Sequence, residues 1–170
     1  MNKFLFIKLC FLLVLFSAYL FAQKEFSLAV YDLKTDGIDS SKVRTITDKL
    51  RAELVKTGAF RVMERGEMEA IFAEQKFQAS GICDKDDKLV EMGRLLGVEK
   101  IVTGSVGEFN KNFFVMNVKM IDVETGEIVK EESEIRRTIQ YLLIRSTRYI
   151  AKDFAKFENP LKEQSAQVKK

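Results

Sequence analysis

Two glycines that lie three residues apart, Gly104 and Gly107, are the first candidates for chemistry in this chain. A phosphate-binding loop places its glycines between a strand and a helix start, so that backbone N–H groups and the helix dipole face the anion. Here one predicted strand runs through both glycines toward another strand, and no Lys-Ser or Lys-Thr follows them. Glycines inside a strand more often mark a bulge or a close approach of two backbones. We therefore interpret both glycines as structural.

Acidic residues occur in adjacent pairs, such as Asp86-Asp87 and Glu131-Glu132. Catalysis by carboxylates needs two groups at a defined separation in a cleft. These pairs fall at a predicted helix start and on a predicted strand face, which favours solvated charge. The run from Asp84 to Asp87 lacks the glycine and the distal glutamate of an EF-hand loop. Helix capping explains this run better than calcium binding.

Histidine is absent from the 170 residues. Its absence excludes Ser-His and Cys-His nucleophile pairs, histidine metal sites and the usual proton shuttle near neutral pH. Cys83 is predicted to be buried or inert, with an intermolecular disulfide as the alternative. The sequence thus predicts no enzyme, and no catalytic residue, cofactor, metal ion or small-molecule substrate.

Aromatic and basic residues are mixed on the polar side of a helix predicted near the C-terminus. This composition is enriched at protein interfaces. The residues of the predicted protein-binding surface are Tyr141, Arg145, Arg148 and Tyr149. Two further basic pairs, Arg136-Arg137 and Lys169-Lys170, are predicted to be solvated, with peripheral contact to anionic lipid, glycan or phosphate as the alternative.

The first part of the chain has the pattern of a βαβ unit. Residues 26–33 are apolar on both alternating faces, as in a central strand. An amphipathic helix over residues 42–57 ends at Gly58 and leads into a second strand over residues 60–65. The two strands are expected to be parallel, with a right-handed crossover between them.

Two shorter helices are expected over residues 66–75 and 86–97, and from Lys100 the apolar period changes to two. Three strands are predicted there, over residues 100–109, 113–123 and 127–135. In the middle strand Phe114, Met116, Val118 and Met120 form one apolar face.

Tight reversals at Asn110–Asn112 and Glu124–Glu127 would join these strands, the second with Gly126 at a positive φ. A last helix over residues 138–157 should cover the sheet with an apolar face that includes Ile150, Phe154 and Phe157. The predicted fold is a single mixed α/β domain, a mixed sheet with helices packed on it in the order β-α-β-α-α-β-β-β-α, of the anticodon-binding-domain type.

The N-terminal residues 1–22 combine Lys3 and Lys8 with an apolar run that is short for a membrane span. They are predicted to be a cleaved signal peptide, with an uncleaved anchor as the alternative. The domain is expected over residues 23–157 and a disordered polar tail over residues 158–170. Loss of the two lysines would lower the formal net charge from +3 to +1, which weakens the electrostatic case for nucleic-acid binding.

The order of several short motifs resembles the CsgG family of exported proteins, which includes the curli secretion channels. The motifs, between Phe26 and Thr138, are "LAVYDL", "TGAFRVMERGEMEAIFAEQ", "QASGICD", "MGRLLGVEKIVTGSVGEF" and "IDVETGEIV". A domain of similar shape occurs in the LpoB-type outer-membrane activators of penicillin-binding proteins. The resemblance implies a mixed αβ domain that does not catalyse and that assembles with envelope proteins or with itself.

Three features depart from the family pattern. The channels carry long membrane-spanning insertions where this chain has only Asn110–Asn112. The lipid-bearing cysteine typical of the relatives is missing, and Lys88-Leu89 occupy the region where relatives often place a second cysteine after Cys83. The resemblance therefore implies the fold but not the transport function. We predict an exported accessory protein of the periplasm, with or without association with the outer membrane; an LpoB-like activator of a peptidoglycan synthase is the alternative.

Overall fold

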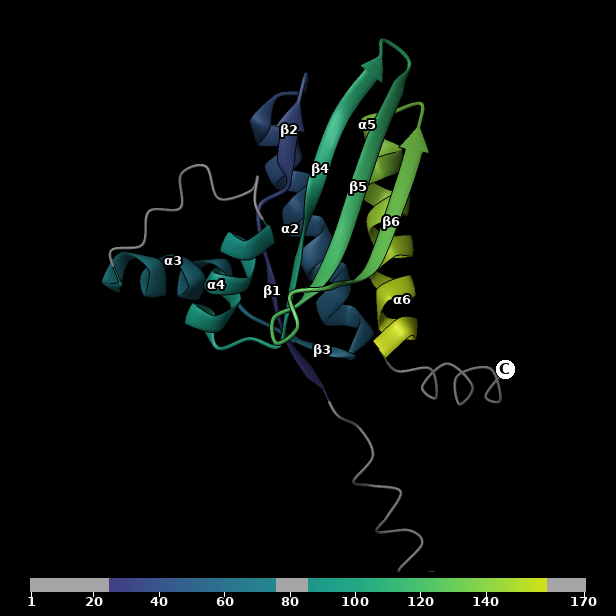
Figure 1. The fold of residues 1–170 in the computed structure, drawn as a ribbon. Coiled ribbons are helices and arrows are strands. Elements are labelled where there is room, and N and C mark those ends of the chain that lie inside the picture. Colours follow the sequence, from purple (N-terminus) through teal and green to yellow (C-terminus); the bar gives the residue numbers. More distant parts are fainter. Residues whose placement is uncertain (1–24, 76–85, 159–170) are drawn as a thin grey trace, which may run out of the picture.

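The computed structural model describes residues 25–75 and 86–158, which form a six-stranded mixed sheet with helices packed on it (Figure 1). The strands are β1 (Phe26–Val30), β2 (Lys34–Asp36), β3 (Phe60–Val62), β4 (Lys100–Asn110), β5 (Phe113–Asp122) and β6 (Ile128–Arg136). The helices are α2 (Ser40–Thr57), α3 (Arg65–Glu74), α4 (Asp86–Leu96), α5 (Ile139–Tyr141) and α6 (Thr147–Glu158), with the π-helical segment η2 (Leu142–Ser146) before α6. The predicted single mixed α/β domain is confirmed. The predicted signal peptide, Cys83 and the predicted tail after Glu158 lie outside the described residues.

The predicted βαβ unit is present, and its strands are parallel. β1 pairs in parallel with β3 on one side and with β4 on the other, which gives the sheet order β3-β1-β4-β5-β6. The last three strands are antiparallel neighbours joined by tight reversals, as predicted. Gly126 has a φ of 77° in the second reversal, and its N–H donates to the Asp122 carbonyl at 2.9 Å. The turn residues expected from the sequence therefore set the register of the three-stranded part.

β2 is an additional strand that the sequence pattern did not predict. The apolar alternation suggested one strand through Leu33, but β1 ends at Val30. The N–H of Leu33 donates instead to the Thr47 hydroxyl of α2, at 3.3 Å. The chain then returns to the edge of β4, where Lys34 pairs with Ser105. A polar strand of three residues has no apolar alternation that could predict it. β2 becomes recognisable only from its pairing with the edge of β4.

Hydrophobic residues cover one face of the sheet and part of the other. On one face the sheet packs against α2 and α6, and the β5 residues Met116, Val118 and Met120 turn toward this layer, as predicted. On the other face α3 and α4 pack over Ala29 and Ile121. Figure 1 shows the two helical layers on opposite sides of the sheet, with α2 and α6 together behind β4, β5 and β6. The outer side of the α2 and α6 layer is therefore one continuous helical surface.

The C-terminal helix follows the predicted course but is not regular. It begins as α5, widens into η2 and continues as α6. Ile150 and Phe154 are buried, as predicted, whereas Phe157, predicted on the same apolar face, is 49% exposed. That prediction was wrong because Phe157 lies in the last turn of the helix, where the packed layer ends. Within the described ranges, no helix is both long enough and apolar enough to cross a membrane.

Candidate interaction surface

Gly104 and Gly107 lie inside β4, which continues through a hairpin into β5. A Cβ atom on Gly104 would lie 1.9 Å from the carbonyl oxygen of Asn117, on the neighbouring strand. At Gly107 the nearest atom to such a Cβ is the Cβ of Asp36, at 3.3 Å. The structural interpretation is therefore confirmed, and at Gly104 the cause is a close backbone approach.

The acidic pairs have different surroundings. Glu132 on β6 forms an ion pair with Lys130, in which Oε1 lies 2.9 Å from Nζ. Lys130 Nζ also lies 2.7 Å from Asp153 Oδ2 of α6. Asp86 and Asp87 form the first residues of α4, but their side chains and the rest of the acidic run from Asp84 lie outside the described part. Among the residues that the structure describes, no group of three or more acidic or cysteine side chains could hold a metal ion.

The basic pair Arg136-Arg137 lies at the end of β6. Arg136 pairs with Glu134, and the Arg137 guanidinium lies 5.9 Å from the centre of the Phe113 ring. Both cations thus contact neighbours within the chain. Lys169-Lys170, the other predicted basic pair, lies beyond the described residues.

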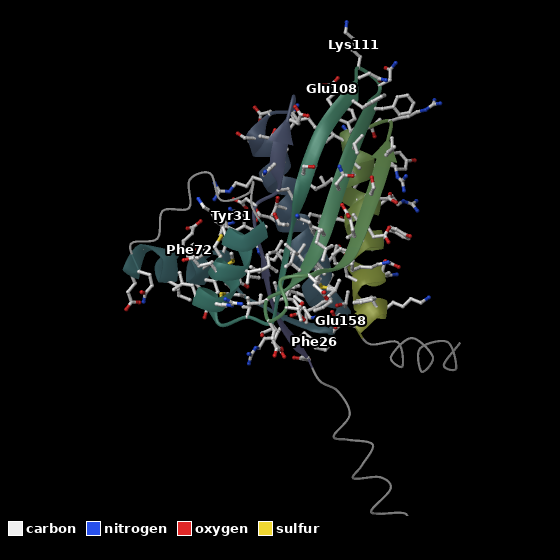
Figure 2. All side chains as sticks on the ribbon, viewed as in Figure 1. Phe26, Tyr31, Phe72, Glu108, Lys111 and Glu158 are labelled. Carbon is white, nitrogen blue, oxygen red and sulfur yellow. The ribbon has the colours of Figure 1, made fainter. Side chains whose placement is uncertain are left out.

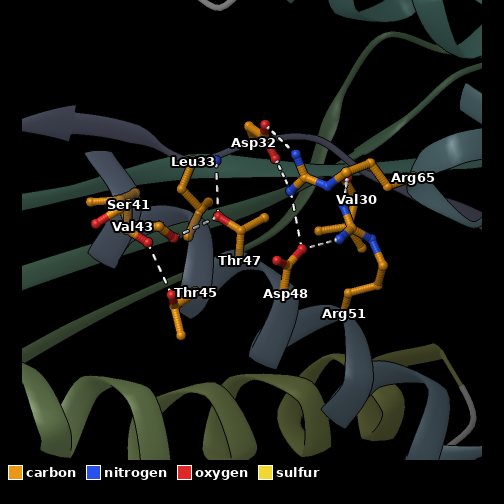
Figure 3. Close-up of polar contacts among 10 residues, drawn as sticks. All are labelled: Val30, Asp32, Leu33, Ser41, Val43, Thr45, Thr47, Asp48, Arg51 and Arg65. Carbon is orange, nitrogen blue, oxygen red and sulfur yellow. Dashed lines mark hydrogen bonds and ion pairs between the residues drawn. The ribbon is translucent and has the colours of Figure 1, made fainter. Parts of the chain in front are cut away.

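Four charged residues form a linear network, Asp32–Arg65–Asp48–Arg51, near the carboxyl end of β1 (Figure 3). Arg65 binds both carboxylate oxygens of Asp32 and reaches Asp48 of α2 at 3.1 Å. Arg51 donates to Asp48 at 2.7 Å and to the Val30 carbonyl at 2.8 Å. Two arginines balance two aspartates, so the network has no excess charge to attract a ligand. Its effect is to fix α2 against β1 and the start of α3.

A pocket of about 460 Å³ opens at the end of the sheet where β4 begins. Lys100 Nζ, at its wall, lies 2.7 Å from Asp122 Oδ2, 3.5 Å from Glu158 Oε1 and 5.5 Å from the centre of the Phe26 ring. Figure 2 shows Phe26 and Glu158 together at this end of the molecule. Because the mostly buried ammonium group is already surrounded by its own partners, we assign no ligand to this pocket.

The four predicted interface residues lie on the outer side of the C-terminal helix. Tyr141 is 55% exposed, Tyr149 is 49% exposed, and the side chain of Arg148 is 54% exposed. Arg145 is also exposed, and Ile144 beside it is 52% exposed. The opposite side of the same helix is the one buried in the core. Binding through the outer side stays a prediction.

Glu53 of α2 lies at the edge of this surface with its side chain buried, and the residue pattern of the sequence did not single it out. Its side chain is only 6% exposed, and three cations surround its carboxylate: Lys49 Nζ at 2.7 Å, Lys56 Nζ at 3.1 Å and Arg148 Nε at 3.5 Å. The hydrogen bond from Lys49 lowers the pKa of Glu53 to about 2; burial opposes this shift and Lys56 adds to it. We call Lys49, Glu53, Lys56 and Arg148 the α2–α6 seam.

The seam could be foreseen only in part. Lys49 and Lys56 lie four residues before and three residues after Glu53, the spacing of neighbours on a helix surface. The contact from Arg148 joins two helices that are far apart in the sequence. Only the packing of α2 on α6 brings it to the same carboxylate.

Comparison with models of known protein families identifies the family of this chain. A family model described as the curli production assembly/transport component CsgG matches residues 22–116, more than half of the chain. The chain belongs to the CsgG family. The matched part of this CsgG-family chain includes the βαβ unit and continues to Met116 in β5, so the family predicted from the motifs is confirmed.

Solved structures show the same fold in other proteins. The C-terminal domain of LpoB from Escherichia coli superposes with a TM-score of 0.57 at 16% identity, over 69% of this chain and 86% of that one. The LpoB C-terminal domain from Salmonella enterica gives 0.55 at 18% identity, over 69% and 86%. Lipoprotein GNA1162 from Neisseria meningitidis gives 0.55 at 15% identity, over 66% and 80%. At these identities the likeness establishes the fold alone. A search of the curated proteins finds no match.

Proposed function

We propose that this CsgG-family chain is an exported, non-enzymatic accessory protein of the cell envelope that acts by binding another protein. Membership of the family and the LpoB-like fold support an envelope role. In this proposal residues 1–22 are the signal peptide, residues 23–157 form the working domain in the periplasm, with or without association with the outer membrane, and residues 158–170 are a tail.

The observation that supports binding most directly is the exposure of Tyr141, Arg145, Arg148 and Tyr149 along one side of the C-terminal helix. Tyrosine offers a large contact area with only two side-chain torsions to fix, and arginine offers several donors in a planar group. The helix is anchored by Phe154, which is fully buried. A rigid helix that presents such side chains has little ordering entropy left to lose on binding.

Site-specific photocrosslinking in cells that express the chain tests this proposal. A photoreactive phenylalanine derivative replaces Tyr141 or Tyr149 in two variants, and Glu69, exposed on α3 on the other side of the sheet, in the control. We expect covalent adducts with an envelope protein from the two helix positions and not from Glu69. Equal adduct yields from all three positions, or none from the helix, would contradict the proposed surface.

A second candidate is an activator of a peptidoglycan synthase, which the likeness to the LpoB C-terminal domains suggests. The added chain should then raise the rate of glycan polymerisation or crosslinking by a purified synthase of the same organism. An unchanged rate at saturating concentrations of the chain would reject this candidate and leave the broader proposal intact.

A further inference from the structure

The outer surface of the α2 and α6 layer has a strong excess of positive charge. Between Thr138 and Asp153 the chain has three basic residues, Arg145, Arg148 and Lys152, and no acidic one. On α2 the lysines Lys42, Lys49 and Lys56 recur at every seventh residue, a spacing that keeps them on one stripe of a helix. Lys49 and Lys56 reach Glu53, and Arg148 of α6 reaches it too, so this stripe borders α6.

The α2–α6 seam does not neutralise its own charge. Three cations surround one carboxylate, which leaves two positive charges in excess. The carboxylate is only 6% exposed, whereas the Lys56 and Arg148 side chains are 62% and 54% exposed. Arg145 and Lys152, on the same helix as Arg148, form no ion pair within residues 25–75 and 86–158. A partner therefore meets accessible cations, and the anion of the seam, Glu53, is covered.

We infer that the partner of this surface is a protein that presents a cluster of acidic side chains to Arg145, Arg148 and Lys152, with apolar side chains between them against Tyr141 and Tyr149. This inference rests on the proposed function and names the chemistry of the partner. Arginine binds a carboxylate through two parallel hydrogen bonds, which fixes the orientation of the partner as well as attracting it. The two tyrosines supply the apolar contact area between the charges.

The distribution of apolar residues favours a protein over a lipid surface. A helix that lies in a membrane interface inserts an apolar face opposite its charged face. Here the apolar face of α6, with Ile150 and Phe154, is fully buried against the sheet. The large hydrophobic or aromatic side chains still exposed on this helix are Tyr141, Ile144, Tyr149 and Phe157, and the two tyrosines lie on the same side as the arginines. This mixture suits an acidic protein surface.

Fluorescence anisotropy with a defined probe tests the inference. The probe is a fluorescein-labelled peptide that repeats the sequence Asp-Leu-Glu-Tyr, and its neutral counterpart repeats Asn-Leu-Gln-Tyr. The exported chain is compared with two triple variants that each remove three positive charges. The first, called the seam variant because it removes Arg148 of the α2–α6 seam together with Arg145 and Lys152 beside it, is Arg145→Gln/Arg148→Gln/Lys152→Gln. The control variant is Lys88→Gln/Arg94→Gln/Lys111→Gln. Lys49 and Lys56 remain with Glu53 in both, and equal unfolding midpoints show that both are folded.

We expect the seam variant to bind the acidic peptide about 10-fold more weakly than the parent, and the control variant to stay within about 2-fold of it. Binding should weaken with added salt. Equal losses in the two variants, or equal binding of the neutral peptide, would overturn the inference.

Three further outcomes also decide against it. Binding of vesicles containing phosphatidylglycerol, lost in the seam variant, without binding of the acidic peptide would make lipid the occupant. Self-association that is lost in the seam variant would make a second copy the occupant. Crosslinks from the photoreactive residue at position 149 that persist unchanged in the seam variant would overturn the inference of an acidic partner. They would leave the proposed function standing. The proposed function fails separately if the parent gives no crosslink although it binds the peptide.

Discussion

Replacing Gly104 with alanine places a methyl group where the structure has no room for one. The new Cβ would lie 1.9 Å from the Asn117 carbonyl oxygen and 2.9 Å from the Cα of Val118. All of these neighbours are backbone atoms of β5, so no side chain can turn away. The two strands must separate locally, or the ladder between β4 and β5 must break.

The size of the effect follows from this geometry. Overpacking a well-packed site costs roughly 1–3 kcal/mol, and each buried backbone group that loses its partner costs about 1–3 kcal/mol more. With one such group lost, we expect the free energy of unfolding to fall by roughly 2–6 kcal/mol, a large part of the total of about 5–15 kcal/mol for a domain. At about 4 °C per kcal/mol for a domain of this size, the unfolding midpoint should fall by roughly 8–24 °C.

Urea unfolding followed by circular dichroism measures this loss, and two other glycines serve as controls. The Cβ of Gly107→Ala would lie 3.3 Å from the Cβ of Asp36 and 3.5 Å from its carbonyl oxygen, the second an ordinary van der Waals contact, so this variant should cost less than about 1 kcal/mol. Gly66→Ala on α3 meets no atom within 4 Å and should be neutral or stabilise by up to about 1 kcal/mol. A Gly104→Ala variant within about 0.5 kcal/mol of the parent would refute the close-approach reasoning.

The remaining predictions concern the C-terminal helix and the seam. Phe154→Ala should lower the free energy of unfolding in urea by about 3–5 kcal/mol because Phe154 is fully buried, whereas Phe157→Ala, at a side chain that is 49% exposed, should cost less than about 1 kcal/mol. Ser146→Ala should cost about 1–3 kcal/mol in the same assay because its hydroxyl donates to the buried Glu134 carboxylate at 2.9 Å. Glu53→Gln should destabilise the chain at neutral pH. The lowered pKa of Glu53, about 2 against a usual 4.5, means that its stabilisation is complete above pH 4.5 and is lost as the pH falls toward 2.

Each of these outcomes has a clear opposite. Equal costs for the two phenylalanine variants would show that the end of α6 packs differently from the structure. If Ser146→Ala left the free energy of unfolding unchanged, a water molecule would be replacing the hydroxyl as the donor to Glu134. A stability difference between the parent and Glu53→Gln that stays constant from neutral pH down to about pH 2 would show that the seam cations do not hold the carboxylate ionised.

The sequence by itself determined the elements whose signals are local. Alternating apolar residues marked β4, β5 and β6, and helical spacing marked α2, whose end at Gly58 has the left-handed conformation expected of glycine. Turn chemistry at Gly126 placed a reversal correctly. These signals come from residues within a few positions of one another, so they can be read without knowledge of the fold.

Tertiary structure alone decided the features that depend on distant residues. β2 exists because the edge of β4 is available to it, and its own residues have no strand pattern. The reason that position 104 requires a glycine is visible only in the fold, where β5 places the Asn117 carbonyl oxygen beside it. Glu53 looked like any helical glutamate until α6 placed Arg148 against it and buried its carboxylate. Periodicity records which face of an element is apolar, whereas contacts between elements arise from packing, and it is packing that sets exposure, charge balance and the surface offered to a partner.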